Sequence, residues 1–426
     1  MKTPMRILLT LLLITGTLGL MAQQTKIDNM RSYDKDATGV FEDAKTSTDF
    51  TGLRVRVGGG FAQQYQSLSH SNSGGADLYD LQPGFNLATA NLNLDVQLAD
   101  GIRLNLITYL SARHHPEAWV KGGYIQFDKL PFDGFDAIME KVTIRVGHME
   151  VNYGDTHFRR TDNGNALYNP FVGNYIVDAF NTEIGGEIYY KDNGLVAMLG
   201  LTGGEINGNI STARTSDVDD SDKKAPSIIG KFGYDSGDNN EDVRFRIMSS
   251  IYTTSSSSAN HIYDGDRGGS RYYLVMSEPG SRASSDFRTG RYNPGFSDKV
   301  TAVMFNAFLE ASGFELFATY ETASGRTNAE TDTRKMNQLG FEALYRFGGN
   351  ENFYLGGRYN TVTADDLGAG QEISINRTQL GGGWFVSPNV LFKLEYVNQN
   401  FNDFNSGNIL HEGNFKGIMV EAAVGF

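Results

Sequence analysis

After its first 22 residues, the chain alternates between apolar and polar residues with a period of two in segment after segment. Asn91–Leu98 (NLNLDVQL) is the clearest case, with leucine and valine at the even positions and amides or aspartate at the odd ones. After a turn at 99–101, Ile102–Leu110 repeats the pattern. Because successive side chains of a strand point to opposite faces, the pattern predicts strands with one apolar and one polar face.

Sixteen segments are predicted to be strands on this basis. They lie at 53–61, 91–98, 102–110, 119–128, 142–152, 181–191, 195–204, 227–234, 242–252, 299–311, 314–321, 336–347, 352–362, 375–385, 390–399 and 414–426. The strand at 119–128 departs from the rule because its two faces are mixed. The connections alternate between short turns and long stretches rich in Ser, Asn, Asp and Gly. An even strand count with connections sorted by length is typical of an antiparallel up-and-down barrel.

The width of such a barrel determines whether the polar or the apolar face of each strand points into the lumen. A lumen enclosed by sixteen strands is too wide for the side chains of the wall to fill. We therefore expect the polar faces to line a water-filled lumen and the apolar faces to contact lipid. The predicted fold is all-β, a transmembrane antiparallel up-and-down β-barrel of about 16 strands, with long extracellular loops and short periplasmic turns. The last strand, Ile418–Phe426, is expected to close the barrel against Leu53–Phe61.

The first 22 residues have the layout of a secretory signal peptide. Lys2 and Arg6 precede the apolar stretch Ile7–Leu20, and the small residue Ala22 follows. We therefore assign 1–22 as a signal peptide, 23–51 as an N-terminal periplasmic segment and 52–426 as an outer-membrane β-barrel of a Gram-negative bacterium. Removing two positive charges lowers the formal net charge of −13 to −15, which disfavours nucleic acid as a partner. The chain has no cysteine, so disulfides do not stabilise it.

Arginines on the predicted inward faces are the first candidate site residues. In an open lumen they would attract anions, since rings of charge set the selectivity of a pore. Alternatively, they pair with acidic neighbours such as Glu183, Glu187, Glu342 and Glu395. Both interpretations stay open at this stage. The arginines are Arg54, Arg56, Arg103, Arg113, Arg145, Arg244, Arg246, Arg346 and Arg358.

The connection 153–180 is the second candidate. It is the third long loop, and it combines Asp155, Arg159, Arg160 and Asp162 with many apolar and aromatic residues that need burial. We expect it to fold into the lumen and narrow it. The alternative is an exposed loop that packs on its own aromatic residues.

Other clusters are weaker candidates for chemistry. The acidic stretches 217–222 and 264–266 lack the spacing of a calcium loop and are interpreted as solvated loop charge. His114 and His115 are neighbours, so on a strand they would point to opposite faces. No nucleophile, base and orienting group stand out together. We therefore expect no enzymatic activity, no metal site and no cofactor.

A family resemblance adds to this reading. Thr143–Gly154 (TIRVGHMEVNYG) resembles a motif of the phosphate-selective porin O/P family, in which R-x-G leads into Y/F-G before the third loop. Gly185–Glu205 (GGEIYYKDNGLVAMLGLTGGE) resembles a hairpin of that family. The stretch 290–302 (GRYNPGFSDKVTA) is similar to porins of Bacteroidetes-type bacteria. The resemblance implies a sixteen-stranded passive channel, a homotrimer, and a third loop that constricts the pore.

Phosphate selectivity does not follow from this resemblance. In the family it depends on stacked arginines and a lysine cluster in the lumen. Here only Arg145, Arg159 and Arg160 lie near the matching region, and the mature chain is acidic.

Three functions are compatible with the sequence. The first is a porin, set in outer-membrane lipid, that lets small hydrophilic solutes or ions diffuse passively through a lumen narrowed by loop 153–180. The second is a non-conducting barrel that acts as a surface adhesin or as a scaffold in a secretion or uptake complex. The third is an outer-membrane enzyme. Conductance in a planar bilayer discriminates the first from the other two.

Overall fold

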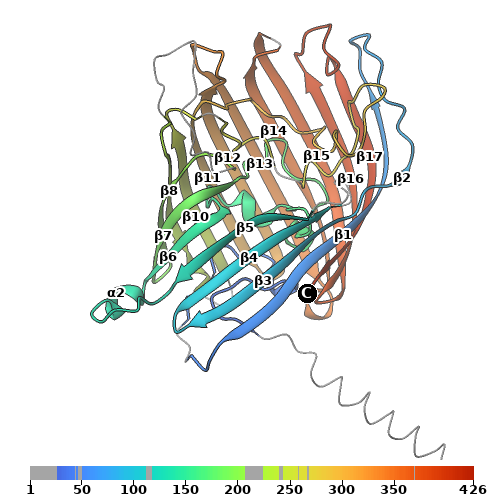
Figure 1. Cartoon of the computed structure of the whole chain (residues 1–426). Helices are drawn as coiled ribbons and strands as arrows, with labels where there is room; N and C mark the ends of the chain where they lie inside the picture. The colour runs from blue at the N-terminus through green and yellow to red at the C-terminus, as the bar shows by residue number, and fades with distance from the viewer. Residues whose placement is uncertain are drawn as a thin grey trace, which may run out of the picture.

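A single antiparallel sheet closes on itself to form the whole molecule (Figure 1). The computed structural model describes residues 26–43, 45–46, 50–111, 118–206, 224–238, 243–257, 259–265, 268–368 and 370–426. The strands are β1 (Arg54–Ser71), β2 (Gly84–Phe85), β3 (Thr89–Ala99), β4 (Ile102–Ser111), β5 (Ala118–Phe127), β6 (Val142–Glu150), β7 (Thr182–Asp192), β8 (Leu195–Thr202), β9 (Ser227–Asp235), β10 (Val243–Thr254), β11 (Lys299–Ala311), β12 (Phe314–Arg326), β13 (Arg334–Phe347), β14 (Phe353–Asp366), β15 (Gln371–Ser387), β16 (Val390–Asn402) and β17 (Gly413–Gly425).

Helical structure in the described residues is confined to short pieces. They are η1 (Lys35–Ala37), α2 (Asp136–Met139), η2 (Thr156–Arg159), η3 (Ala166–Tyr168), η4 (Ser236–Asp238) and η5 (Gly349–Glu351). Among these residues, no helix combines the length and the apolarity needed to cross a membrane.

The prediction of sixteen strands is confirmed. The two-residue β2 pairs with β1, as does β3, so β2 and β3 are two parts of one interrupted strand. Every other strand pairs with its sequence neighbours, and β17 returns to β1 to close the barrel. Each of the sixteen predicted segments coincides with a strand, because the period-2 pattern that identified them reflects the two faces of the wall.

The closing register differs from the expected one. β17 pairs with residues 60–71 of β1, whereas residues 54–62 pair with β3. Strands of a barrel are staggered as they tilt around its axis. The N-terminal part of β1 therefore pairs with β3, and its C-terminal part pairs with β17. Phe426 still takes part in closure, because its N–H and C=O both hydrogen-bond to Gly59, at 3.0 and 2.8 Å.

A β-bulge explains the mixed faces of the segment 119–128. In the pairing of β4 with β5, Ile107 lies opposite Gly122 and Thr108 lies opposite Val120, which leaves Lys121 as an extra residue. Val120 is 66% exposed on the outside, and Lys121 is 4% exposed on the inside. A bulge re-aims side chains in this way, and here it directs an ammonium group into the lumen.

The outer surface of the wall is apolar, as expected for contact with lipid. Leu199, Leu355 and Leu394 on three different strands are about 60% exposed. Tyr345, Phe347, Phe353 and Trp384 form a row of stacked rings, with centroids 5.8–6.1 Å apart, near the end of the barrel where the short turns lie. Such a row fits the aromatic girdle at a membrane interface.

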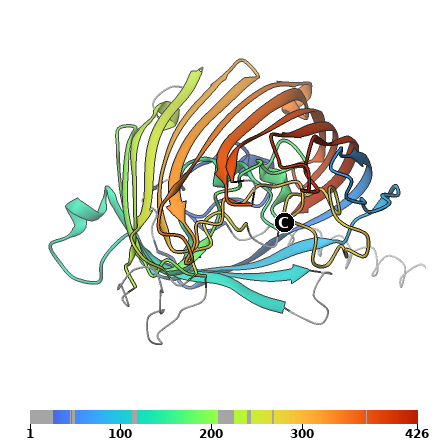
Figure 2. The same ribbon diagram turned by 90° about the horizontal axis from the view of Figure 1, so that it is seen from above.

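The interior holds segments of the chain that enter the barrel from both ends. We name three of them: the N-terminal segment (residues 26–46), the inner loop (151–181) and the mouth loop (255–298). Figure 2 shows the green inner loop and the yellow mouth loop within the ring of strands. Val172 and Ile176 of the inner loop and Tyr272 of the mouth loop form one buried cluster with inward residues of the wall, such as Met336 and Val397.

A charge on the lipid-facing surface tests the orientation of the wall. We expect Leu199→Arg to destabilise the folded barrel by about 2–4 kcal/mol, because it places a guanidinium near the middle of the bilayer. Leu367→Arg is the matched control, since Leu367 is 56% exposed in the connection between β14 and β15. Urea unfolding in lipid vesicles measures both variants, and equal stability of the two would contradict this orientation.

Candidate functional site: a lumen lined and filled by charged segments

The N-terminal segment lies inside the barrel, near the end where the short turns lie. The backbone N–H of Lys35 donates to Pro388 O in the β15–β16 turn at 2.8 Å, and the Tyr33 hydroxyl donates to Asp95 of β3 at 2.8 Å. Phe41, 2% exposed, packs edge-on against Phe308 of β11. The sequence predicts that 23–51 is an N-terminal periplasmic segment. The contacts of residues 29–43 and 45 lie within the lumen, where their charges and rings complement those of the wall.

Two acidic side chains from different segments share two bases of the wall. Glu42 of the N-terminal segment and Asp155 of the inner loop both contact Lys231 of β9, at 2.9 and 2.7 Å, and Arg246 of β10, at 2.7 and 2.9 Å. All four side chains are at most 4% exposed. We call this group the four-charge cluster. It connects the N-terminal segment and the inner loop to the same place on the wall.

The two carboxyl groups of the four-charge cluster have lowered pKa values. Burial by itself would raise the pKa of the Glu42 carboxyl, but Arg246 and Lys231 hold that pKa well below its ordinary value. The pKa of Asp155 is lowered for the same reason. A depressed folded-state pKa means that the stabilisation is present above the ordinary carboxyl pKa and is lost only as the pH falls further.

The inner loop is held to neighbouring strands of the wall by a second charged cluster. Arg159 pairs with Glu315 of β12 and, at 2.9 Å, with Glu342 of β13. Glu342 also accepts a hydrogen bond from Arg358 of β14 at 2.8 Å and one from Tyr175 of the loop at 2.6 Å. Both carboxylates are almost fully buried. Together, the two clusters fix the inner loop to the wall from β9 to β14.

Backbone groups of the inner loop are also satisfied by side chains of the wall. Val172 N donates to Glu395 of β16 at 2.7 Å, Ile176 N to Asn360 of β14 at 2.7 Å, and Val177 N to Gln338 of β13 at 3.0 Å. Buried N–H groups need such partners. The polar inward residues that the period-2 pattern identifies thus replace water around this loop.

The predicted arginines lie inside the barrel and pair with acids or amides, with one outside the described residues. Their partners are Gln97 and Asp28 for Arg54, Asp95 for Arg56, Asp128 for Arg103, Asp43 for Arg145, Asp235 for Arg244, Asp155, Glu42 and Asp235 for Arg246, Glu315 for Arg346, and Glu342 for Arg358. Arg113 lies outside the described residues, as do His114, His115, the acidic stretch 217–222 and Asp266.

The acidic partners are mostly not the expected ones. Of Glu183, Glu187, Glu342 and Glu395, Glu342 is the one that forms ion pairs within the described part of the chain. Glu183 accepts from Tyr252 at 2.6 Å and Glu395 from Tyr272 at 2.6 Å, so hydroxyl groups satisfy them. Glu187 accepts from Tyr189 and from Asn152 N. Which acid meets which base depends on strand order and loop path, and neither follows from alternation.

The remaining two loop candidates, Arg160 and Asp162, also have partners inside the barrel. Arg160 binds Asp178 of the same loop through two hydrogen bonds of 2.7 and 2.6 Å. Asp162 pairs with Lys121 and accepts from Tyr109 of β4 at 3.0 Å. Sequence reasoning missed Lys121 and the acidic residues of the N-terminal segment. The mixed faces of 119–128 were the signal for Lys121, since they mark the bulge.

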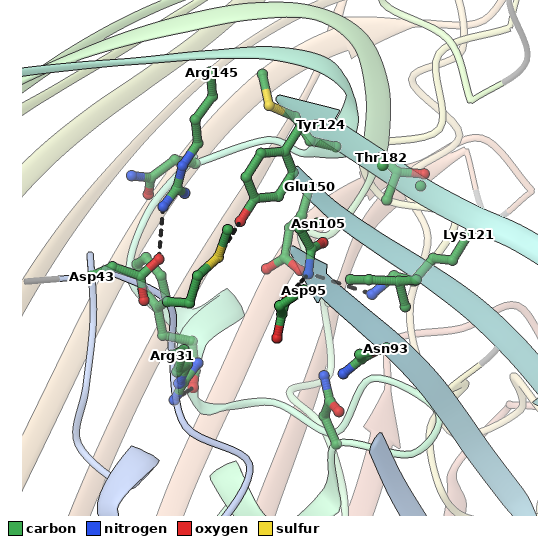
Figure 3. A pocket seen from close by; sticks show the side chains of 18 of the residues that line it. Arg31, Asp43, Asn93, Asp95, Asn105, Lys121, Tyr124, Arg145, Glu150 and Thr182 are labelled. Atoms are coloured by element: carbon green, nitrogen blue, oxygen red, sulfur yellow. Dashed lines mark hydrogen bonds and ion pairs between the residues drawn. The ribbon is translucent and has the colours of Figure 1, made fainter. Parts of the chain in front are cut away.

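A cavity of about 160 Å³ remains between the N-terminal segment, the inner loop and the wall from β3 to β7 (Figure 3). Its lining is charged, amide-bearing and aromatic: Arg31, Asp43, Asn93, Asp95, Asn105, Lys121, Tyr124, Arg145, Glu150 and Thr182 are labelled in the figure. Arg145 faces Asp43 at 2.7 Å and lies over the rings of Tyr124 and Tyr189. Within the described residues, no group of three or more His, Cys, Asp or Glu side chains could hold a metal ion.

Similar solved structures are outer-membrane proteins. The outer membrane channel DcaP of Acinetobacter baumannii is 11% identical, with 90% of this chain and 100% of that chain covered and a TM-score of 0.51. OprB of Pseudomonas putida is 11% identical, with coverage of 88% and 94% and a TM-score of 0.52. OmpT of Vibrio cholerae is 10% identical, with coverage of 89% and 100% and a TM-score of 0.51.

The chain has the fold of an outer-membrane porin. With its closed wall and apolar outer belt, it is a transmembrane barrel of the Gram-negative outer membrane. No family model matches the sequence, and neither does any curated protein.

Neutralising a shared carboxylate tests how the inner loop is anchored. We expect Glu342→Gln to cost about 3–5 kcal/mol, because it leaves Arg159 and Arg358 buried with one negative charge fewer. Urea unfolding of the detergent-folded barrel measures the loss, and limited proteolysis reports release of the inner loop. Glu372→Gln is the matched control at an exposed position of β15, with an expected change within about 0.5 kcal/mol. If the two variants are equally stable, the anchoring role of Glu342 is refuted.

Proposed function

We propose that the protein is a porin through which small hydrophilic solutes or ions diffuse passively, along a lumen that the inner loop narrows. The single observation that carries the proposal is the charged cavity inside a closed, lipid-facing barrel. Charged and amide groups that face a lumen set which solutes enter and how fast they pass. The fold shared with outer-membrane channels supports the same function.

We place the solute path along the wall from β3 to β7. Elsewhere, the inner loop and the mouth loop pack against inward residues of β8–β17 in a buried apolar cluster, which also includes Tyr189 of β7. On the β3–β7 side, the wall is less tightly covered, and the Glu150 side chain is 32% exposed. Arg56, Arg145 and Lys121 line the cavity there. The other predicted arginines are proposed to act mainly by holding the inner loop and the N-terminal segment in place.

The pairing of charges bears on selectivity. Arg56 and Arg145 each contact a carboxylate at 2.7 Å, and Lys121 pairs with Asp162. Paired charges present dipoles to a passing solute, and their net field is small. We therefore propose weak ion selectivity and a preference for small polar solutes over phosphate.

A non-conducting barrel is the second candidate, and the filled interior favours it. In that role, the long loops would act at the surface. The mouth loop is the largest of them, but Tyr263, Tyr272, Tyr273 and Phe287 from it are at most 5% exposed. A loop that buries its aromatic residues inside the barrel exposes less apolar surface to which a partner protein could bind. This favours the porin over the non-conducting barrel.

We also propose that the barrel assembles as a homotrimer. An open apolar groove on the outer face of β13–β17 is lined by Phe353, Leu355, Trp384 and Leu394, with Gly356 and Gly382 at its floor. Small residues let two surfaces approach closely in a membrane. One similar structure, of OmpT from Vibrio cholerae, is described as a trimer form. Chemical cross-linking in native outer membranes should give a ladder that ends at the trimer.

Conductance with a charge substitution tests the porin. We expect purified protein in a planar bilayer to give stepwise conductance under a salt gradient. Lys121→Gln should move the reversal potential toward cation preference, because it removes a positive charge from the cavity and leaves Asp162 there. Lys335→Gln makes the same charge change at an exposed position of β13 and should leave the reversal potential unchanged. A folded barrel with no conductance, even without its N-terminal segment, would rule the function out.

A further inference from the structure

We infer that the N-terminal segment is a plug that closes the end of the lumen where the short turns lie, and that solute passage requires its displacement. The inference rests on the proposed function, because a gate has meaning only in a channel. It stands on three independent features of the described residues: where the segment binds, what it binds with, and how the wall is shaped to receive it.

The segment contacts the wall around most of its circumference. Lys45 donates to Val142 O of β6, the carbonyl of Gly39 accepts from Arg244 of β10, and Lys35 bonds to the β15–β16 turn. Tyr33 reaches β3, and Phe41 reaches β11. Contacts on opposite sides mean that the segment spans the opening, so it blocks a solute that follows the barrel axis.

The contacts are largely electrostatic and sit where the segment meets the solute path. Asp43 pairs with Arg145 at 2.7 Å at the edge of the cavity, and Glu42 belongs to the four-charge cluster. When Glu42 leaves, Lys231 and Arg246 still have Asp155 of the inner loop as a partner. The wall therefore keeps a counter-charge after the segment is displaced, and the inner loop stays anchored.

The wall has a recess that fits the segment. Gly58 lies in β1, and Gly425 lies in β17 opposite Gly60 of β1. A Cβ at Gly58 or at Gly425 would overlap Tyr33. The Arg56 guanidinium lies 4.7 Å from the centre of the Tyr33 ring on its other side. Strand interiors disfavour glycine unless another group approaches closely. Here the approaching group is the plug, which explains the missing side chains at these two positions.

Arg31 connects the plug to the inner loop. Its guanidinium donates to Phe158 O at 3.0 Å and lies 3.8 Å from the centre of the Tyr168 ring, while the Tyr168 hydroxyl donates to Ser32 O at 2.8 Å. These are contacts to carbonyl groups and an aromatic ring. The plug can separate from the inner loop here without leaving a buried acid unpaired.

Two substitutions with matched controls loosen the plug in different ways. Asp43→Asn removes the charge that holds Arg145, and Asp36→Asn makes the same change at an exposed position of the segment. Gly58→Val fills the recess under Tyr33, and Gly84→Val adds the same side chain where a Cβ would meet nothing within 4 Å. In a planar bilayer, we expect Asp43→Asn and Gly58→Val to raise the conductance several-fold. Both controls should match the unaltered chain.

A reversible cross-link between the plug and the wall tests whether the plug must move, without weakening its binding. Because the chain has no cysteine, Asp43→Cys combined with Arg145→Cys introduces the only two thiols, at positions whose native side chains are in contact. A short cross-linker with a maleimide at each end and a disulfide between them should join the two thiols by addition and lower the conductance. A reductant, which cleaves the central disulfide, should restore it. Asp36→Cys combined with Arg145→Cys should not respond. Deleting residues 27–46 should give the highest conductance.

The outcomes separate the gate from the channel. If the unaltered, the cross-linked and the shortened proteins all conduct equally, the plug is not a gate, although the porin stands. If none of them conducts while each is folded, the proposed function falls and the gate falls with it. If the shortened chain fails to fold, the cross-linked pair and Gly58→Val still decide, because both retain the whole segment.

Discussion

Closure of the sheet is the constraint on which everything else depends. In lipid, each backbone N–H and C=O must find a partner within the protein, and the pairing of β1 with β17 removes the last free edge. A ring of sixteen strands, however, encloses more space than its own inward side chains can fill. The N-terminal segment, the inner loop and the mouth loop fill that space in this protein. Their backbone groups are then satisfied by amides and carboxylates of the wall, such as Glu395, Asn360 and Gln338.

Most charged side chains inside the barrel hold the interior segments to the wall, and only some of them are placed to act in transport. Glu342 binds two arginines, and the four-charge cluster holds two separate segments at one place on the wall. Buried ion pairs contribute modestly to net stability, yet breaking one leaves a costly unpaired charge. Such pairs therefore specify where a segment lies. The few charges beside the cavity, Lys121 and Glu150 among them, are the ones in a position to meet a solute.

The strands could be predicted from the sequence because alternation is a local property. Each residue of 299–311 or 390–399 shows by its own polarity which face it occupies, and the strands follow. The burial of loop 153–180 could be predicted because its apolar residues cannot remain in water. The position of residues 29–45 could not, since a short segment with mixed charges and rings is compatible with solvent as well as with a lumen. Lys121 was hidden by a bulge that shifts the pattern by one residue.

The sequence by itself therefore determined the closed transmembrane barrel, its sixteen strands and which face meets lipid. The tertiary structure decided which half of β1 receives β17, which acid pairs with which base, and that the N-terminal segment occupies the lumen. The physical reason is the range of the forces involved. The preference of a side chain for lipid or water is a property of each residue. It can therefore be recognised from the local alternation of apolar and polar residues. Ion pairs such as Asp43 with Arg145 join residues far apart in the chain, and they exist only once the barrel has closed around them.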